Sequence, residues 1–266
     1  MHFLKELYDN RKLIMNLAKS DFKTKYAGSF LGIIWAFVQP VVTVIVYSIV
    51  FQVVFAQADV GEVPYVLWLI TGLVPWFFFN DALNGGTNAM IEYNYLVKKV
   101  VFKISILPIV KIISALFVHL FFICFTIAIY VICGVLPGLY AVQIVYYMAC
   151  AFILTLGLTY ATSAVVVFFR DLTQIISIVL QVGVWFTPIM WNIDNPAFNI
   201  PGVIRKILML NPMYYIVGGY RDSLVNKVWF WQRPTLTLYF WCFTGLTFAF
   251  GVFIFKRLKV HFADVL

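Results

Sequence analysis

Two apolar stretches of the sequence carry uncharged polar and aromatic side chains at intervals of four residues. These residues are Trp35, Gln39, Thr43 and Tyr47 in the first stretch, and Ser177, Gln181 and Trp185 in a later one. Four residues turn an α-helix about 40° beyond a full turn, so each set spreads over one helix face. Aromatic rings stack on sugar rings and amides bond hydroxyl groups, so these faces suit a hydrated, sugar-tolerant pathway. Hydrogen bonding between packed helices is the alternative.

No catalytic constellation accompanies these residues. The sequence has no GxxxxGK[ST] phosphate-binding loop, HExxH pair or GxSxG elbow. Its four cysteines and three histidines show no metal-ligand spacing. Asp81 is the only acidic candidate within the apolar stretches, and no partner for it is evident. We therefore expect that this chain has no catalytic residue and binds neither a metal nor a cofactor.

Two other functional classes stay open at this point. A membrane enzyme of polyprenyl-linked sugar metabolism would need acidic residues at the membrane surface, and Asp59 and Glu62 are candidates. A channel would need an ion filter such as a ring of charges, and the sequence indicates none.

The elements that hold these side chains must lie in lipid. Hydrophobic residues make up 63% of the 266 residues and charged residues only 11%, whereas soluble domains are about 45–50% apolar and about 25% charged. A net charge of +8 is also typical of proteins that bind nucleic acid. The basic residues, however, fall in short strips between apolar stretches. Membrane orientation explains this distribution better, so we expect no nucleic-acid partner.

Six stretches are long enough to cross a bilayer core, which needs about 20 helical residues. They cover residues 30–56, 64–83, 107–133, 141–169, 173–192 and 236–255. We therefore predict an all-α integral membrane protein with six transmembrane helices in a single domain, 1–266. The fourth stretch contains small residues, Gly157 and Ala161 among them, which predicts a seam of close helix packing.

Two further segments are expected to touch the membrane without crossing it. Residues 1–28 combine apolar and charged positions at roughly helical spacing, which predicts an amphipathic helix in the cytoplasmic interface. A solvated helical arm is the alternative. Residues 193–234 contain two short apolar pieces separated by prolines, which predicts an exofacial re-entrant hairpin between the fifth and sixth helices. A loop on the bilayer surface is the alternative there.

The basic residues also predict the orientation of the chain. They collect before the first span, between the second and third, at Arg170 and after the last span. The first loop on the opposite side carries only Asp59 and Glu62. The positive-inside rule then places both termini in the cytoplasm.

Six strings, in this order, resemble the permease subunit of the type-2 ABC exporters of polysaccharides and polyol phosphates. They are KYAGSFLGIIW at 25–35, GLVPWFFF at 72–79, NYLVKK at 94–99, FRD at 169–171, WFTPI at 185–189 and LNPMY at 210–214. Members of that family export lipid-linked O-antigen, teichoic acid or capsule across the bacterial inner or plasma membrane. The resemblance implies the same activity here. A permease for drugs or other lipids is the nearest alternative.

The resemblance also implies partners and the residues that meet them. Such permeases form homodimers, and each copy pairs with a separate ABC ATPase that binds ATP and Mg. The ATPase-coupling positions of the family correspond to Glu92, Tyr95, Lys98 and Lys99, with a second contact region at Arg170 and Asp171. The exofacial re-entrant gate corresponds to the segment that contains Pro212, Tyr214 and Tyr215.

Lys23 and Lys25 are expected to meet the phosphate of the lipid-linked substrate as it enters from the cytoplasmic leaflet. The family often has Arg-Tyr where Lys25-Tyr26 stands. The charge is therefore retained, but the bidentate phosphate contact that Arg makes is not. Positive-inside topology signals are the alternative interpretation of both lysines.

Overall fold

The computed structural model of the chain describes residues 8–54, 59, 63–98, 103–193 and 200–265. The elements in these ranges are helical. The α-helices are α2 (Arg11–Lys25), α3 (Trp35–Ser48), α4 (Tyr65–Glu92), α5 (Asn94–Val97), α6 (Leu107–Ile132), α7 (Ile144–Val165), α8 (Leu172–Phe186), α9 (Gly202–Met209), α10 (Pro212–Arg221), α11 (Pro234–Leu258) and α12 (Phe262–Val265), and short 3-10 or π segments adjoin several of them. The predicted all-α class is therefore confirmed for the described part of the chain.

Five helical stretches in the described ranges are long and apolar enough to cross a membrane. They are Gly32–Val54, Tyr65–Glu92, Ile104–Ile132, Leu139–Val165 and Pro234–His261. These stretches coincide with the first four predicted spans and the last one. The second helix continues from the predicted end at 83 to Glu92. Polar residues such as Asn84 and Asn88 lower the hydropathy of its last turns but do not end the helix.

The fifth predicted span, 173–192, differs from the structure. Its helix α8 covers 15 residues, about 22 Å, which is shorter than a hydrocarbon core of about 30 Å. The helix ends because Thr187 precedes Pro188 and is extended, with φ −91° and ψ 122°; the proline ring disfavours the α conformation in the residue before it. The described residues thus contain five helices of spanning length where the hydropathy pattern predicts six.

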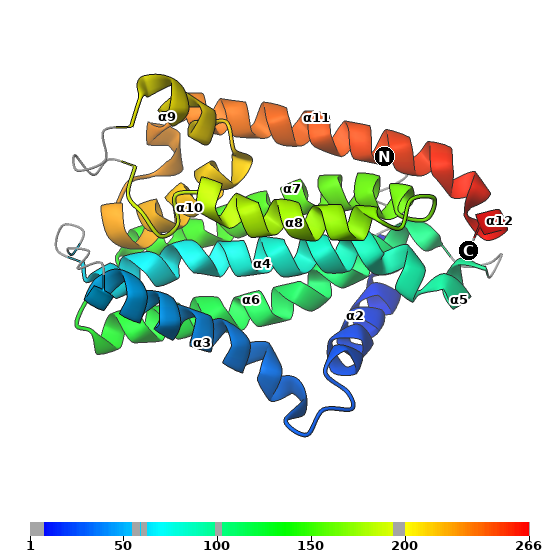
Figure 1. Cartoon of the computed structure of the whole chain (residues 1–266), viewed down its shortest axis with the longest axis horizontal. Helices are drawn as coiled ribbons and strands as arrows, with labels where there is room; N and C mark the ends of the chain where they lie inside the picture. The colour runs from blue at the N-terminus through cyan, green and yellow to red at the C-terminus, as the bar shows by residue number, and fades with distance from the viewer. Residues whose placement is uncertain (1–7, 55–58, 60–62, 99–102, 194–199, 266) are drawn as a thin grey trace.

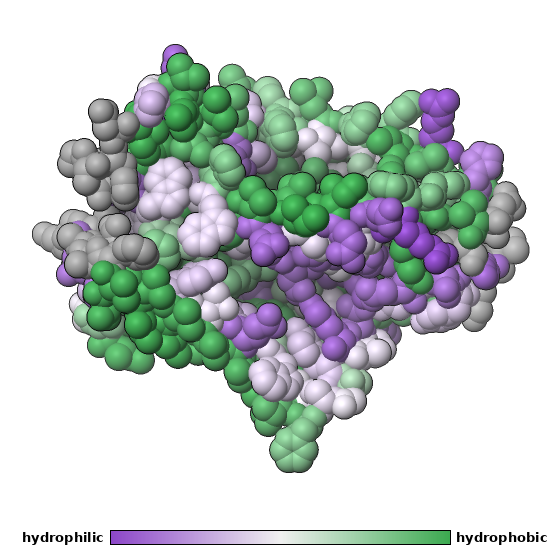
Figure 2. Space-filling model, viewed as in Figure 1, coloured by the Kyte–Doolittle hydropathy of each residue, from purple (hydrophilic) through white to green (hydrophobic). Residues whose placement is uncertain are grey.

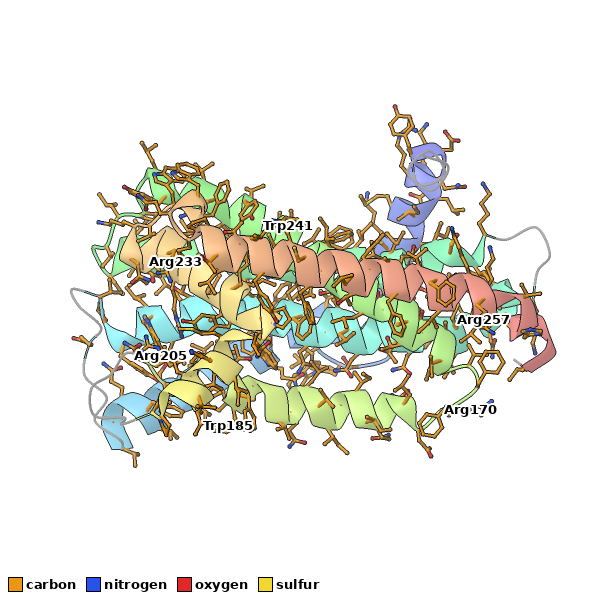
Figure 3. The ribbon with its side chains drawn as sticks, turned by 90° about the horizontal axis from the view of Figure 1, so that it is seen from above. Arg170, Trp185, Arg205, Arg233, Trp241 and Arg257 are labelled. Carbon is orange, nitrogen blue, oxygen red and sulfur yellow. The ribbon has the colours of Figure 1, made fainter. Side chains whose placement is uncertain are left out.

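Helix α4 forms the centre of the bundle. Most of its side chains are buried, and it packs against α6, α7, α8 and α10. Figure 1 shows α4 between α8 and α6, with α5 and α12 at one end of the bundle and α9 at the other. Helix α2 is steeply inclined to the long helices and extends from the side of the bundle, as Figures 1 and 3 both show, and it packs on α6.

The predicted packing seam in the fourth stretch is confirmed. Helix α7 lies against α11, where Gly157 meets Gly251. A Cβ atom on Gly251 would stand 2.1 Å from the carbonyl oxygen of Gly157. Backbone contact this close is available only to residues without a side chain, and it is typical of helix pairs in membranes.

We predict that Gly251→Ala destabilises the protein by about 1–3 kcal/mol, because the added methyl group forces the α7 and α11 backbones apart. The matched control is Gly245→Ala on the same helix, where an added Cβ would have nothing within 4 Å. Thermal unfolding of the purified protein in detergent measures both variants. Equal melting temperatures for Gly251→Ala and the wild type would contradict the close packing of this seam.

Candidate functional site

A cleft of about 570 Å³ opens between α3, α4, α6, α8 and the end of α2. We call it the aromatic cleft. The residues of the two predicted faces that line it are Trp35, Gln39, Thr43, Tyr47, Gln181 and Trp185. Figure 2 shows hydrophilic side chains gathered over α4, bordered by the apolar surfaces of α8 on one side and α3 on the other. The structure therefore brings together six of the seven residues that spacing placed on the two faces.

The polar residues of α3 are spaced about one helical turn apart, so they share the helix face that borders this cleft. Gln39 is exposed at the cleft, whereas Thr43 is half-buried and donates its hydroxyl to the carbonyl oxygen of Gln39 at 2.9 Å. From the facing helix, Trp185 is 52% exposed. An exposed indole and an exposed amide facing one space can stack on a sugar ring and bond its hydroxyl groups.

The seventh residue, Ser177, does not line the cleft. Its hydroxyl donates to the Asn84 side chain of α4 at 3.2 Å. One turn away, Thr173 donates to the Asn88 side chain at 2.9 Å, and Asn84 donates to Asn80 within α4. Ser177 therefore belongs to a hydrogen-bonded seam that fixes α8 against α4. The four-residue spacing of Asn80, Asn84 and Asn88 in the sequence could have predicted this seam.

Lys25 closes one end of the aromatic cleft through an ion pair with Asp81. The sequence indicated no partner for Asp81, and the structure supplies one from a helix 56 residues away. Burial lowers the pKa of Lys25, but the carboxylate of Asp81 outweighs that effect and leaves the pKa above its ordinary value. Lys25 is therefore fully charged at neutral pH.

A second cavity of about 380 Å³ lies on the other side of this ion pair, between α2 and the ends of α4 and α6. We call it the α2 cavity. In it, Lys111 of α6 lies 2.6 Å from Asp21 of α2 and also pairs with Glu92 of α4. The hydroxyl of Tyr93 donates to Asp21 at 2.7 Å. The Lys111 and Asp21 side chains are only 10% and 8% exposed, and removing one partner of such a buried pair costs about 3–5 kcal/mol. The cluster therefore fixes α2 to the bundle.

The positions matched to ATPase coupling have different surroundings. Glu92 is engaged by Lys111, whereas Tyr95 and Lys98 of the α5 segment are exposed. Lys99 lies outside the described residues. Arg170 and Asp171 are exposed in the turn between α7 and α8.

The charged residues labelled in Figure 3 separate to the two ends of the bundle. Arg170 and Arg257 lie at one end and Arg205 and Arg233 at the other. Lys23 is exposed and lines neither the aromatic cleft nor the α2 cavity. Of the two lysines predicted to meet phosphate, only Lys25 thus faces an internal space of the structure.

The segment predicted as a re-entrant hairpin folds into α9 and α10. Pro212 begins α10, and the Asn211 side chain caps it by accepting from the backbone N–H of Met213 at 2.9 Å. Tyr215 is buried, with its hydroxyl 3.1 Å from that of Tyr146. Tyr214 lines a small cavity of about 120 Å³ beside α10.

Arg221, at the end of α10, is a functional candidate that the sequence analysis did not single out. It is buried and donates to the carbonyl oxygens of Pro188 and Ile189, at 2.6 and 2.5 Å. Its guanidinium carbon lies 3.3 Å from the ring centroid of Trp68. These contacts hold the turn after α8 against α4 and α10. An isolated Arg in a hydrophobic sequence gives no local sign of such a role.

Comparison with known proteins identifies the family of the chain. Residues 12–225 match the ABC-2 type transporter family. A Myxococcus xanthus protein named O-antigen export system permease protein RfbA is 30% identical over 223 residues, 83% of each chain. A Klebsiella pneumoniae protein of the same name is 29% identical over 261 residues, 96% of this chain and 95% of the relative. The matched range exceeds half of the chain and includes the helices of the aromatic cleft, so this multi-pass membrane protein belongs to the ABC-2 type transporter family.

Proposed function

We propose that the chain is the transmembrane subunit of an ABC exporter that moves a lipid-linked polysaccharide out of the cytoplasm. The observation that carries the proposal is the aromatic cleft, where α3 and α8 present indole and amide side chains to one space. The comparisons support the proposal, because relatives aligned over 83% and 96% of the chain are named O-antigen export system permease proteins. O-antigen, teichoic acid and capsule polymers all have the sugar or polyol hydroxyl groups that such a cleft suits.

The proposed topology has six membrane segments in the bacterial inner or plasma membrane, with both termini cytoplasmic. In it, α8 crosses most of the bilayer and α9 with α10 form the exofacial re-entrant hairpin. The predicted cytoplasmic segments hold 14 of the 19 Lys and Arg residues, and residues 200–233 hold the other five. This excess supports a cytoplasmic position for the end of the bundle where Arg170 and Arg257 lie (Figure 3). Helix α2 is steeply inclined to the long helices (Figure 1), as a helix in the membrane interface would be.

Two copies of the chain form the proposed translocation path. Helices α3 and α8 border the aromatic cleft and still expose apolar side chains, including Ile45, Ile178 and Val182. A two-fold dimer would cover these surfaces and place the two clefts face to face around one axis. The polymer then passes along Trp35, Gln39 and Tyr47 of each copy, and Gln181 and Trp185 opposite them.

Energy for transport comes, in this proposal, from a separate ATPase subunit that binds ATP and Mg. Exposed Tyr95 and Lys98 of the α5 segment form its docking surface. Movement of α5 would displace Glu92 at the end of α4. Because Lys111 pairs with both Glu92 and Asp21, this displacement would also move α2. The buried ion cluster thus transmits ATPase movement to the helix that borders the cleft entrance.

We predict that Gln39→Ala and Trp185→Ala each reduce polysaccharide export several-fold, because each removes a hydrogen-bonding or stacking group from the cleft. The control is Phe253→Ala, an exposed aromatic residue of α11 that does not line the cleft. Surface polymer is measured in cells lacking the native permease, and co-purified ATPase verifies assembly. Wild-type export by both cleft variants would remove these residues from the pathway.

We predict that Lys98→Glu weakens binding to the ATPase by about tenfold, because it reverses a charge on the docking surface. Lys206→Glu is the matched control, since Lys206 is an exposed lysine on α9 at the opposite end of the bundle. Co-purification of the two subunits at increasing salt measures the effect. Equal recovery of the ATPase with both variants would refute docking at α5.

A further inference from the structure

Three aromatic rings gather where the spans that contain α7 and α11 begin. Trp229 and Trp231 belong to the turn at residues 227–233, between α10 and α11. Their indole rings stack, with centroids 4.6 Å apart and an interplanar angle of 9°. The ring of Tyr140, near the start of the span Leu139–Val165, lies 4.9 Å from that of Trp229. We call Tyr140, Trp229 and Trp231 the tryptophan cluster.

Hydrogen bonds from the bundle fix the turn that carries this cluster. The buried Gln143 side chain donates to the carbonyl oxygen of Val228 at 2.7 Å and accepts from the N–H of Phe230 at 3.0 Å. Arg233, at the end of the turn, pairs with buried Asp222 through two nitrogens, at 2.8 and 2.9 Å. The position of the tryptophan cluster relative to α7 and α11 is therefore set by contacts within the chain.

The surface changes in polarity at the tryptophan cluster. Figure 3 shows Arg233, the last residue of the turn, at one end of the bundle. In and beside the turn, Asn226, Lys227 and Gln232 are exposed. Along the two spans the exposed side chains are apolar. They include Leu139, Val142, Val145, Leu238 and Leu246, which are 63–81% exposed. Such a change marks the level at which a bundle leaves the hydrocarbon core of the bilayer.

We propose that the tryptophan cluster binds the carbonyl and headgroup layer of the leaflet at this end of the bundle, and so fixes the depth of α7 and α11. Indole combines a large apolar ring with one N–H donor, so it is most stable where hydrocarbon meets polar groups. Gly157 and Gly251 pack α7 closely against α11, so one anchor holds both helices. The proposal uses the membrane location of the chain and not the identity of its cargo.

A platform for exported sugar is the competing interpretation of the cluster. A sugar ring needs a free aromatic face, but Trp229 is half-buried against Tyr140 and Trp231. None of the three rings lines the aromatic cleft. Figure 3 shows Arg233 beside α11 and Trp185 of the cleft on α8, on opposite sides of the bundle. The 56% exposed ring of Trp231 therefore lies away from the proposed polymer path and beside the apolar surface of the spans.

The test measures the depth of a fluorescent amino acid that replaces Trp231 in the permease–ATPase complex, reconstituted in phosphatidylcholine vesicles. The quenchers are lipids brominated near the carbonyl end of the acyl chain, lipids brominated near its methyl end, and aqueous iodide. We expect the shallow bromines to quench position 231 about twofold more than the deep ones, because interfacial aromatic rings lie at the headgroup level. The control position is Leu246, which is 74% exposed and about 18 Å along α11 from Pro234. There the order should reverse.

Two further variants test whether the cluster fixes helix depth. With the fluorophore at position 246, Trp231→Ala should lower the ratio of deep to shallow quenching, because α11 is no longer held at one depth. Trp231→Tyr should keep the wild-type ratio, since tyrosine also prefers the interface. Trp231→Phe gives a second readout without a fluorophore. The tryptophan emission lost in this variant should be the part that shallow bromines quench in the wild type.

Three results would overturn the proposal. The first is quenching of position 231 by iodide and by neither brominated lipid, which would place the ring in water, within reach of exported polymer. The second is protection of position 231 from all three quenchers, which would mean that protein covers it, such as a second copy of the chain. The third is an unchanged quenching ratio at position 246 in a Trp231→Ala complex that retains its ATPase.

Discussion

A polar side chain within a bilayer must contact protein or water, because lipid offers no hydrogen-bond partner. In this chain, many polar residues of the apolar stretches gather around α4. Asn84 and Asn88 bond the side chains of α8, and Asp81 pairs with Lys25 of α2. These side-chain contacts tie α8 and the end of α2 to α4, whereas the body of α2 packs on α6. The aromatic cleft is the space bounded by these helices and by α3.

The ion pairs of α2 link that cleft to the surface of the bundle. Asp21 joins α2 to Lys111 and, through it, to Glu92 at the end of α4. Lys25 joins the same helix to Asp81 beside the cleft. An amphipathic helix held at both points responds as a unit to movement of α4. This gives a physical route from α5 to the entrance of the cleft.

Local spacing predicted the parts of the molecule that depend on one helix at a time. Hydropathy located the long helices, and the intervals from Trp35 to Tyr47 and from Gln181 to Trp185 predicted shared helix faces, whose residues line the cleft. Local spacing did not predict contacts between segments that are distant in the sequence. Asp81 lies 56 residues from Lys25, and Ser177 lies 93 residues from Asn84. The short length of α8 was missed because apolar residues continue past Pro188, although the helix ends at Phe186.

The central claim is that polymer passes through the aromatic cleft, and contact between cleft and cargo tests it most directly. A photo-crosslinking amino acid is placed at Gln39, which lines the cleft, or at Ile45, which is 51% exposed on α3 and does not line it. After irradiation of exporting cells, the purified permease is probed for attached polysaccharide. The account predicts an ATPase-dependent adduct at position 39 and none at position 45. Equal adducts at both positions, or an adduct at position 45 alone, would contradict it.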